Sequence, residues 1–349
     1  MNHKFTLVLG AILLTICAGV LITAQQKNLK SSGQNGKADA NNYRLSGPFT
    51  HKNLSIFLIH SRTRITTTTR TFLTLQEALQ QKKVVVYETK NVNELAIENL
   101  STQDVYVQSG DIVKGGQQDR MMAVDFIVPP KSGRMPIAAF CVEHGRWSGR
   151  GSERVAVFSS SSDAVATRDI KLAAKVANSQ GAVWENVRLA QDKLSRRVGQ
   201  RVNSPVSESS LQLAVENNRV QETADSYLKA LSDIVNRGDD VIGYVFAING
   251  KVNSADVYSS NALFRKLWPK LLKANAVEAI AELQKESFKP VSGESVKTFL
   301  TEAEQAQASS KQVTKRVKVV TREDDKNAYF ETVDDEKGAW VHRNYIKKN

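Results

Sequence analysis

The segment from Gly110 to Trp147 contains most of the residues in this chain that could bind a ligand or carry out chemistry. It opens with GDIVKGGQQDR, which ends at Arg120, and it closes with CVEHGRW, which begins at Cys141. Such a combination of glycine, fixed charges, cysteine and histidine indicates either a ligand site or a backbone that only special residues can build. It matches no catalytic signature, so whether the protein is an enzyme stays open.

Two adjacent glycines, Gly115 and Gly116, follow Asp111 in the first motif. Adjacent glycines let a backbone approach a ligand closely and turn its N–H groups toward an anion. The alternative is a bulge or a tight turn between two strands. The spacing differs from that of a phosphate-binding loop, and no Gly-Lys-Ser/Thr follows. We therefore favour the turn, which can also form part of a ligand site.

Gln117 and Arg120 come after the glycines. The planar guanidinium of arginine matches a carboxylate or a phosphate, so Arg120 favours an anionic small molecule as the ligand. The alternative is an internal ion pair that holds two strands together, with Asp111, Asp119 or Glu143 as the partner. The sequence does not decide between these interpretations.

Cys141, Glu143 and His144 look at first like a nucleophile with a base. On a strand, however, neighbouring side chains point to opposite faces, so Cys141 and Glu143 would share one face and His144 the other. A cysteine among apolar residues is usually a small core residue, and we expect this of Cys141. Glu143 remains as the candidate catalytic base if the protein is an enzyme.

Aromatic and metal-binding residues are the remaining candidates. Trp147 could stack on a planar ligand beside Arg146, but we favour a hydrophobic plug under the loop 148–152. Trp184 and Trp268 lie among apolar residues at helical spacing, which predicts that both belong to the core. No metal and no cofactor are predicted, because the histidines have no tight ligand spacing. They are, outside the N-terminal segment, His51, His60, His144 and His342.

The N-terminus has the pattern of a targeting segment. Lys4 precedes an apolar run, Phe5–Ala24, so we predict a signal peptide over residues 1–24. The alternative is an uncleaved signal anchor, which would be the only contact with a membrane. In either case we expect the rest of the chain outside the cytoplasm, periplasmic or secreted. Cys141 is then the only cysteine left, so no internal disulfide is possible.

A polar stretch follows the targeting segment. Gln25–Ser46 is rich in Gln, Asn, Lys, Ser and Gly, which predicts a disordered linker over residues 25–50. A single domain is expected over residues 51–349. The formal net charge is +12, but the basic residues alternate with acidic ones and form no nucleic-acid module. We therefore expect no specific nucleic-acid binding.

The hydrophobic pattern predicts an α+β fold with a β-rich N-terminal half and a helical middle. The clearest local feature is Asn249-Gly250, which predicts a tight hairpin turn between two strands. We expect the hairpin and the C-terminal strands to complete the early sheet, giving one intertwined domain. The expected strands are 54–60, 84–88, 105–108, 112–114, 121–128, 135–142, 241–248, 251–258, 317–319, 328–332 and 339–345. The expected helices are 73–81, one capped by Ser179, two after Pro205, one from Asn261 that Pro269 should kink or split, 276–283 and 296–306.

Five separated motifs resemble one family, the ARG and rhodanese-phosphatase-superfamily-associated protein domain. They are GDIVKGGQQDR, VPP, CVEHGRW, AVWENV and INGKV…LFRKLW, in this order. The resemblance implies an α+β domain of unestablished activity, and the family name associates it with ADP-ribose-related and phosphatase-like enzymes. The residues that match the motifs are Asp111, Gly115, Gly116, Gln117, Arg120, Cys141, Glu143, Gly145, Arg146 and Trp147.

Two hypotheses about function remain. In the first, an exported module binds an anionic or nucleotide-like ligand, with or without catalysis, through Arg120, Arg146 and the glycine backbone. In the second, a non-enzymatic scaffold or interaction domain uses the same residues as an internal cluster of turns and salt bridges. The two differ in whether Arg120, Glu143 and Arg146 line an open pocket or are buried against each other.

Overall fold

The computed structural model describes residues 40–348, except 63–70, 152 and 154. The predicted signal peptide and most of the predicted linker lie outside these residues. Residues 35–349 group into one unit. Within the described part of the chain, no helix has the length and apolar character needed to cross a membrane.

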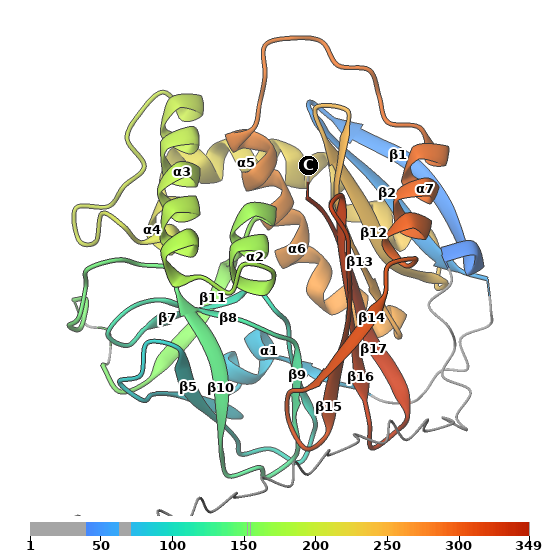
Figure 1. Ribbon diagram of the computed structural model, residues 1–349. Helices are drawn as coiled ribbons and strands as arrows, with labels where there is room; N and C mark the ends of the chain where they lie inside the picture. The colour runs from blue at the N-terminus through green and yellow to red at the C-terminus, as the bar shows by residue number, and fades with distance from the viewer. Residues whose placement is uncertain (1–39, 63–70, 152, 154, 349) are drawn as a thin grey trace, which may run out of the picture. The chain divides into compact units, whose positions relative to one another are not determined.

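The largest sheet joins the first and the last strands of the described residues. Its eight strands are antiparallel and run in the order β1-β2-β12-β13-β17-β16-β15-β14 (Figure 1). The predicted hairpin forms its centre, and the C-terminal strands extend it, which confirms the intertwined α+β arrangement. The strands are β1 Tyr43–His51, β2 Leu54–Ser61, β12 Val241–Ile248, β13 Lys251–Tyr258, β14 Ala308–Gln312, β15 Val317–Glu323, β16 Asn327–Asp334 and β17 Ala339–Lys347.

A second sheet, of six strands, contains or adjoins the two motifs GDIVKGGQQDR and CVEHGRW. Its order is β11-β7-β8-β10-β5-β4. The two ends meet, because Tyr87 pairs with Val157 and the Glu88 N–H donates to the Ala156 carbonyl at 3.1 Å, so the sheet closes on itself. The strands are β4 Val84–Glu88, β5 Glu94–Asn99, β7 Asp111–Gly115, β8 Arg120–Met122, β10 Arg134–Cys141 and β11 Phe158–Val165. A small third sheet contains β3 Leu73–Thr74, β6 Val105–Val107 and β9 Phe126–Val128.

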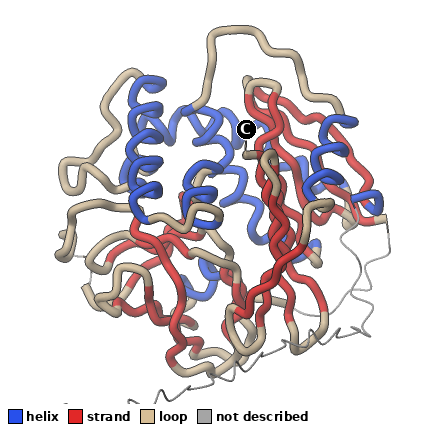
Figure 2. The backbone as a smooth tube through the Cα atoms, viewed as in Figure 1, coloured by secondary structure: helices blue, strands red, loops and turns tan. Residues whose placement is uncertain are grey.

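Helices cover both faces of the large sheet (Figure 2). Along β2, Ile56 and Leu58 belong to the hydrophobic core that also contains α5 and α6, whereas Phe57 and Ile59 belong to the core that contains α7. This two-sided burial explains why the segment is an apolar run without alternation. The helices are α1 Leu75–Gln80, α2 Arg168–Lys175, α3 Gln180–Val198, α4 Leu211–Val215, α5 Asn218–Leu231, α6 Asn261–Ala281 and α7 Gly293–Ala303. Ser179 caps α3 as predicted.

Several expected boundaries are wrong. β1 begins at Tyr43, inside the predicted linker, because an edge strand can be polar and largely exposed. The run 121–128 is two strands, β8 and β9, and β5, β11 and β14 were not expected. Pro269 lies within a continuous α6, and the helix expected at 276–283 is the end of α6. Burial of nearly the whole second half of α6 outweighs the cost of the proline.

Candidate functional site

The glycine turn joins β7 to β8 and faces an arginine of the same chain. Gly115 and Gly116 have positive φ values of 117° and 56°. Their carbonyl oxygens accept hydrogen bonds from Arg146 Nη2 and Nη1, both at 3.1 Å. The Gly115 N–H donates to Asp119 Oδ1 at 3.0 Å. The turn therefore presents carbonyl groups to a cation, and the N–H groups of Gly115, Gln117 and Asp119 are already bonded to carboxylates.

Glu143 is completely buried and surrounded by donors. It accepts from Arg146 Nε at 2.6 Å and Nη2 at 2.7 Å, and from the backbone N–H of Asp119 at 2.8 Å. Arg150 Nη1 lies at 3.4 Å, and the Ser207 hydroxyl also donates. Burial alone would raise the pKa of Glu143, but the hydrogen bonds from Arg146 and Ser207 outweigh it and lower the pKa. A carboxylate held in this way is a poor general base.

Asp119, which directly precedes β8, lies beside Glu143 and is also held by charged and polar side chains. Arg150 binds its two oxygens at 3.0 and 3.1 Å, and the Ser210 hydroxyl donates at 2.8 Å. Two carboxylates and two guanidinium groups thus neutralise each other in the interior. We call Asp119, Glu143, Arg146 and Arg150 the ion-pair clamp. Charged groups paired and hydrogen-bonded in this way can stay buried without a ligand.

Arg120 points away from the clamp. It is fully buried, with Nη1 3.2 Å from the Val92 carbonyl and Nη2 3.4 Å from Glu88 Oε1. Its guanidinium also contacts the sulfur of Cys141, the residue opposite it in the sheet. Burial raises the pKa of the Cys141 thiol to about 11, which keeps it protonated and unreactive. The partner of Arg120 is Glu88, not one of the three carboxylates considered from the sequence.

The structure brings some predicted site residues together and separates others. The glycines, Glu143 and Arg146 meet because β7, β8 and β10 are neighbours. Asp111 instead pairs with Lys270 at 2.7 Å, and the Gln117 N–H donates to Glu88 at 3.2 Å. Trp147 is 52% exposed, so its interpretation as a plug is wrong.

Sequence reasoning missed Arg150, Ser207 and Ser210 as members of the cluster. The two serines belong to a segment that was interpreted only as a helix breaker around Pro205. Nothing in the sequence says that this segment returns to the strand ends after helix α3. Arg150 was missed because it belongs to a glycine- and serine-rich loop, where a charged residue is usually exposed.

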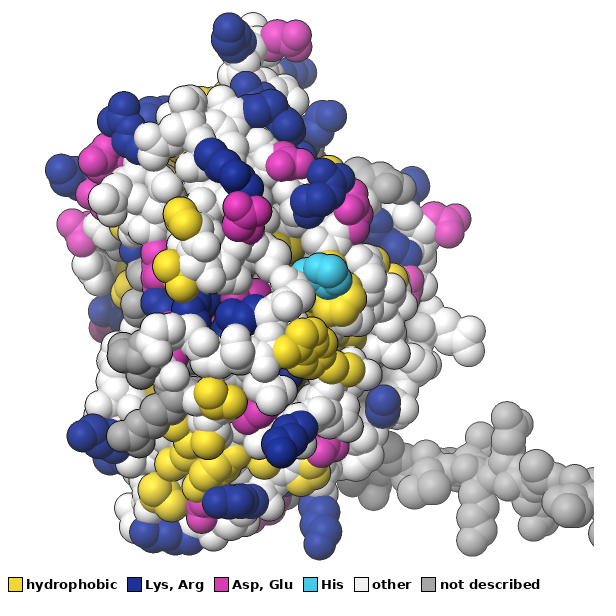
Figure 3. Space-filling model, turned by 90° about the vertical axis from the view of Figure 1, so that its left-hand side faces the viewer, with side chains coloured by type: hydrophobic (Ala, Val, Ile, Leu, Met, Phe, Trp, Pro, Cys, Tyr) yellow, Lys and Arg dark blue, Asp and Glu magenta, His cyan; other side chains and the backbone are white. Residues whose placement is uncertain are grey.

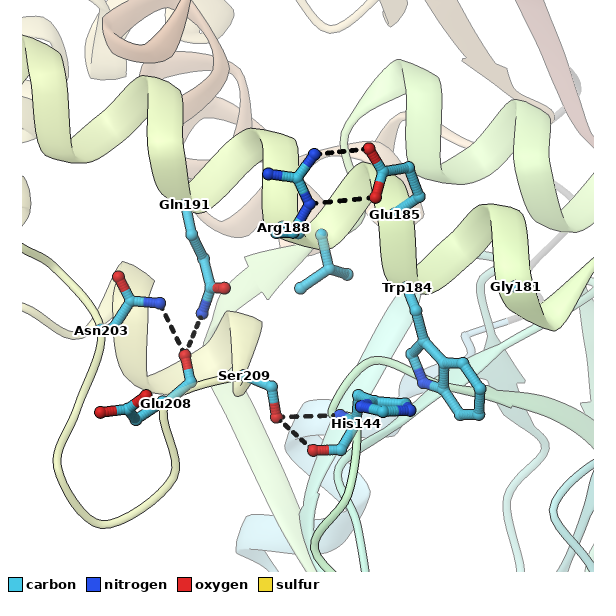
Figure 4. Close-up of a pocket in the computed structure, with 10 residues that line it drawn as sticks. His144, Gly181, Trp184, Glu185, Arg188, Gln191, Asn203, Glu208 and Ser209 are labelled. Atoms are coloured by element: carbon cyan, nitrogen blue, oxygen red, sulfur yellow. Dashed lines mark hydrogen bonds and ion pairs between the residues drawn. The ribbon is translucent and has the colours of Figure 1, made fainter.

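A hollow of about 390 Å³ is lined by residues that include His144 and Ser209 (Figure 4), the chain neighbours of Glu143 and Ser210. His144 and Trp184 form one wall, with ring centroids 4.4 Å apart and planes at 74°. Trp184, expected in the core, is therefore a wall of this hollow. The other lining residues are Gly181, Glu185, Val187, Arg188, Gln191, Asn203, Glu208 and Ser209. Figure 3 shows a histidine beside apolar side chains on the face that contains α3.

The clamp holds the loop that borders this hollow. Ser207 binds Glu143 and Ser210 binds Asp119, while Ser209 accepts the His144 N–H at 3.0 Å. Figure 4 shows Asn203 and Gln191 both donating to the Glu208 carbonyl, at 2.7 and 3.0 Å. The hollow therefore owes its shape to a segment fixed at both ends.

A second buried polar cluster lies between the large sheet and the β9 region. His342 on β17 contacts Asp125 at 2.6 Å through Nδ1 and Asp256 on β13 at 3.0 Å through Nε2. Asp256 also accepts from Asn344 Nδ2 at 2.9 Å and from the Tyr244 hydroxyl at 3.1 Å. Among the described residues no group of histidine, cysteine and carboxylate side chains is arranged to hold a metal ion. With a carboxylate on each nitrogen, His342 is suited to donate two hydrogen bonds as an imidazolium.

Comparisons with known proteins give one match. Searches of curated proteins and of solved structures return no significant similarity. The family description "ARG and Rhodanese-Phosphatase-superfamily-associated Protein domain" matches residues 42–346, which span the three sheets and the helices α1 to α7. The chain therefore belongs to this family.

Proposed function

We propose that this protein is a non-catalytic binding domain that works outside the cytoplasm, and that its two glycine- and arginine-rich motifs are structural. The observation that carries the proposal is the complete burial of Glu143 against three donor side chains of its own chain, those of Arg146, Arg150 and Ser207, and one backbone N–H. An external anion would have to displace these partners. Leaving a buried charge unpaired costs several kcal/mol, on the order of 3–5.

The hydrogen bonds of Arg146 also indicate that the motifs are structural. Its guanidinium binds Glu143 through two nitrogens and also donates to the carbonyls of Gly115, Gly116 and Ser148. All three of its nitrogens are thus engaged. A guanidinium with this many partners has no free edge for a phosphate or a carboxylate.

The clamp supports a binding surface rather than forming one. It fixes the exit of β10 and the loop around Ser207, and these segments contribute His144, Glu208 and Ser209 to the hollow. We place the binding surface at this hollow, where Trp184 and His144 offer two aromatic edges beside polar groups. Aromatic rings of this kind commonly contribute to contacts in binding sites.

Two variants test the role of the motifs. We expect Glu143→Gln to destabilise the fold by about 3 kcal/mol, because Arg146 and Arg150 then keep one buried carboxylate between them. Arg120→Ala should be similarly harmful, since it removes the guanidinium that forms the ion pair with Glu88. Thermal unfolding should show both effects, whereas the surface variant Glu185→Gln should leave the melting temperature close to that of the wild type. ADP-ribose, nucleotides and inorganic phosphate should not raise the melting temperature of the wild type.

The opposite result would establish a ligand site in the motifs. In that case Glu143→Gln would fold with nearly wild-type stability, and one of these anions would stabilise the wild type but not the variant.

The extracytoplasmic location is supported by Lys4 and the apolar run Phe5–Ala24. Fractionation of cells followed by mass spectrometry of the N-terminus tests it, and an intact N-terminus in the cytoplasmic fraction would contradict it.

A further inference from the structure

The charged side chains at the rim of the hollow are paired with each other. Arg188 forms ion pairs with Glu185 at 2.6 Å and with Asp192 at 2.8 Å. Arg201 forms one with Glu208 at 3.0 Å. Figure 4 shows the charged ends of Arg188 and Glu185 directed toward each other. The rim therefore has no excess of positive charge that would attract an anion, so neutral groups must recognise the ligand.

Three side chains that line the hollow have hydrogen-bonding groups that the protein leaves unused. Gln191 is 2% exposed, and its Nε2 donates to the carbonyls of Glu208 and Ser210 at 3.0 and 3.1 Å. Its Oε1 accepts no hydrogen bond from any described residue. Within the same described ranges, the Trp184 Nε1–H and the imidazole of His144 also have no hydrogen-bond partner. Enclosed polar groups are usually bonded, so unused ones around a hollow indicate a polar ligand.

The residues that α3 contributes to the hollow include a single stripe along the helix. Trp184, Val187 and Gln191 are three and four positions apart, so their side chains lie on one face on successive turns. From Trp184 to Gln191 the stripe extends for about 10 Å, at about 1.5 Å per residue. It offers an aromatic ring, a buried apolar side chain and an amide oxygen, in this order. His144 lies beside Trp184 at one end of it.

We propose that the hollow binds a neutral saccharide that carries an N-acetyl group, with room for two sugar rings. The C–H face of a sugar ring is apolar and slightly positive, which matches the electron-rich face of the Trp184 indole. An N-acetyl group supplies an N–H donor for Gln191 Oε1 and a methyl group for Val187. Sugar hydroxyls donate and accept, so they match the His144 imidazole. This inference rests on the proposed function, because it names a ligand class for the hollow assigned there.

A peptide or an anion matches the hollow less well. A peptide strand binds by adding to an exposed sheet edge, and an amphipathic peptide helix binds in an apolar groove. The walls of the hollow are instead the side of α3 and the loop before α4, and polar side chains come from both. An anion would have to compete for Arg188, which already binds two carboxylates.

Two disaccharides test the ligand class. N,N′-diacetylchitobiose and cellobiose have the same linkage and differ only in the acetamido groups that replace hydroxyls. In isothermal titration calorimetry with the full-length protein, we expect diacetylchitobiose to bind about tenfold more tightly, since only its acetamido groups offer an N–H to Gln191 and a methyl group to Val187. Its affinity should be the same at low and high salt. Equal affinities for the two disaccharides, or no binding of either, would overturn the proposal.

Two tryptophan variants test the position of the site. Trp184 lines the hollow, whereas Trp147 is exposed and is not one of the lining residues. We expect Trp184→Ala to weaken the binding of diacetylchitobiose about tenfold and Trp147→Ala to leave it unchanged. Trp184→Phe keeps an aromatic ring if the alanine variant does not fold, and it should weaken binding by a smaller factor. Wild-type affinity in folded Trp184→Ala, or in Trp184→Phe if only that variant folds, would contradict the proposed position.

Failure of this inference and failure of the proposed function give different results. The NMR signals of the His144 ring are followed while diacetylchitobiose or a mixture of tripeptides is added. A shift with the tripeptides but not with the disaccharide would show that the hollow binds peptides, and the saccharide would be wrong. Binding of diacetylchitobiose followed by its hydrolysis would support the ligand class and contradict the non-catalytic role.

Discussion

The buried charges determine what single residues in this protein can do. Glu143 and Asp119 are held by arginines and serines, so their oxygens serve the fold. A buried ion pair adds little net stability compared with apolar residues, but removing one partner is costly. The clamp is therefore better understood as a device that specifies which segments meet. It joins the turn before β8, the exit of β10 and the loop before α4.

His342 gives a pH dependence that can be predicted with its sign. The two carboxylates Asp125 and Asp256 outweigh burial and raise its pKa above 6.5. A raised pKa stabilises the fold below the unfolded value of about 6.5, and this stabilisation is lost as the pH rises through the folded value. In urea unfolding, the stability difference between wild type and His342→Gln should be large at pH 6 and shrink toward pH 9. A constant difference over this range would show that His342 is neutral in the folded protein.

The aspartates of the same cluster act in the acidic range. The charge of Lys171 and the hydrogen bond from His342 outweigh burial and lower the pKa of Asp256 to about 2. The contribution of Asp256 to the stability of the fold is therefore present above about pH 4 and lost as the pH falls toward 2. The cluster stabilises the protein most between about pH 4 and 6.5, where carboxylates and imidazolium are all charged.

At the residue scale, the sequence draws attention to the two motifs but does not identify the residues that their side chains bind. The two glycines, Arg120, Glu143 and Arg146 stand out because of their types, and all of these positions except Arg120 converge. Their side chains bind Glu88, Arg150 and Ser207, which are ordinary residues of a strand end and of two loops. Only the three-dimensional path of the loop after α3 brings Ser207 to Glu143, and no local pattern encodes that path.

At the scale of elements, the β7–β8 turn depends on a glycine with no room for a side chain. A Cβ atom on Gly116 would lie 2.2 Å from the Phe158 ring, at a φ of 56°. Gly133 has a similar φ of 62°, but nothing lies within 4 Å of its Cβ position. The two glycines thus separate the cost of the backbone conformation from the cost of a clash.

We expect Gly116→Ala to cost about 3 kcal/mol, because the strained backbone and the displaced Phe158 both contribute. Gly133→Ala should cost only about 1 kcal/mol, the backbone contribution alone. Chemical denaturation of both variants measures the difference. Equal losses would mean that Phe158 moves aside freely and that the turn is less tightly packed than the structure indicates.

Local sequence signals were most informative for elements with strong caps and turns. Asn249-Gly250 and Ser179 were placed correctly, because a two-residue turn and a helix cap depend on nearby atoms only. β1 was missed because its exposed, polar residues form an edge strand, and β14 is exposed along its whole length. Pairing with a distant partner strand, which no local window contains, makes these segments strands.

At the scale of the whole molecule, the large sheet makes the two ends of the chain depend on each other. β17 lies between β13 and β16, and β1 and β2 continue the same sheet on the other side of the central hairpin. The sheet therefore cannot be completed before the last residues of the chain are available. Folding that relies on such distant contacts is expected to be slow and cooperative.

Truncation tests this dependence. A chain that ends at Lys337 loses β17, which separates β14–β16 from the rest of the sheet and removes His342 from its two carboxylates. We expect this chain to be insoluble or to lack a cooperative unfolding transition in circular dichroism. A chain that ends at Lys347 keeps every paired residue of β17 and should unfold like the wild type. A soluble, cooperatively folded product from the shorter chain would mean that β1, β2 and the hairpin form an independent folding unit, contrary to the intertwined arrangement.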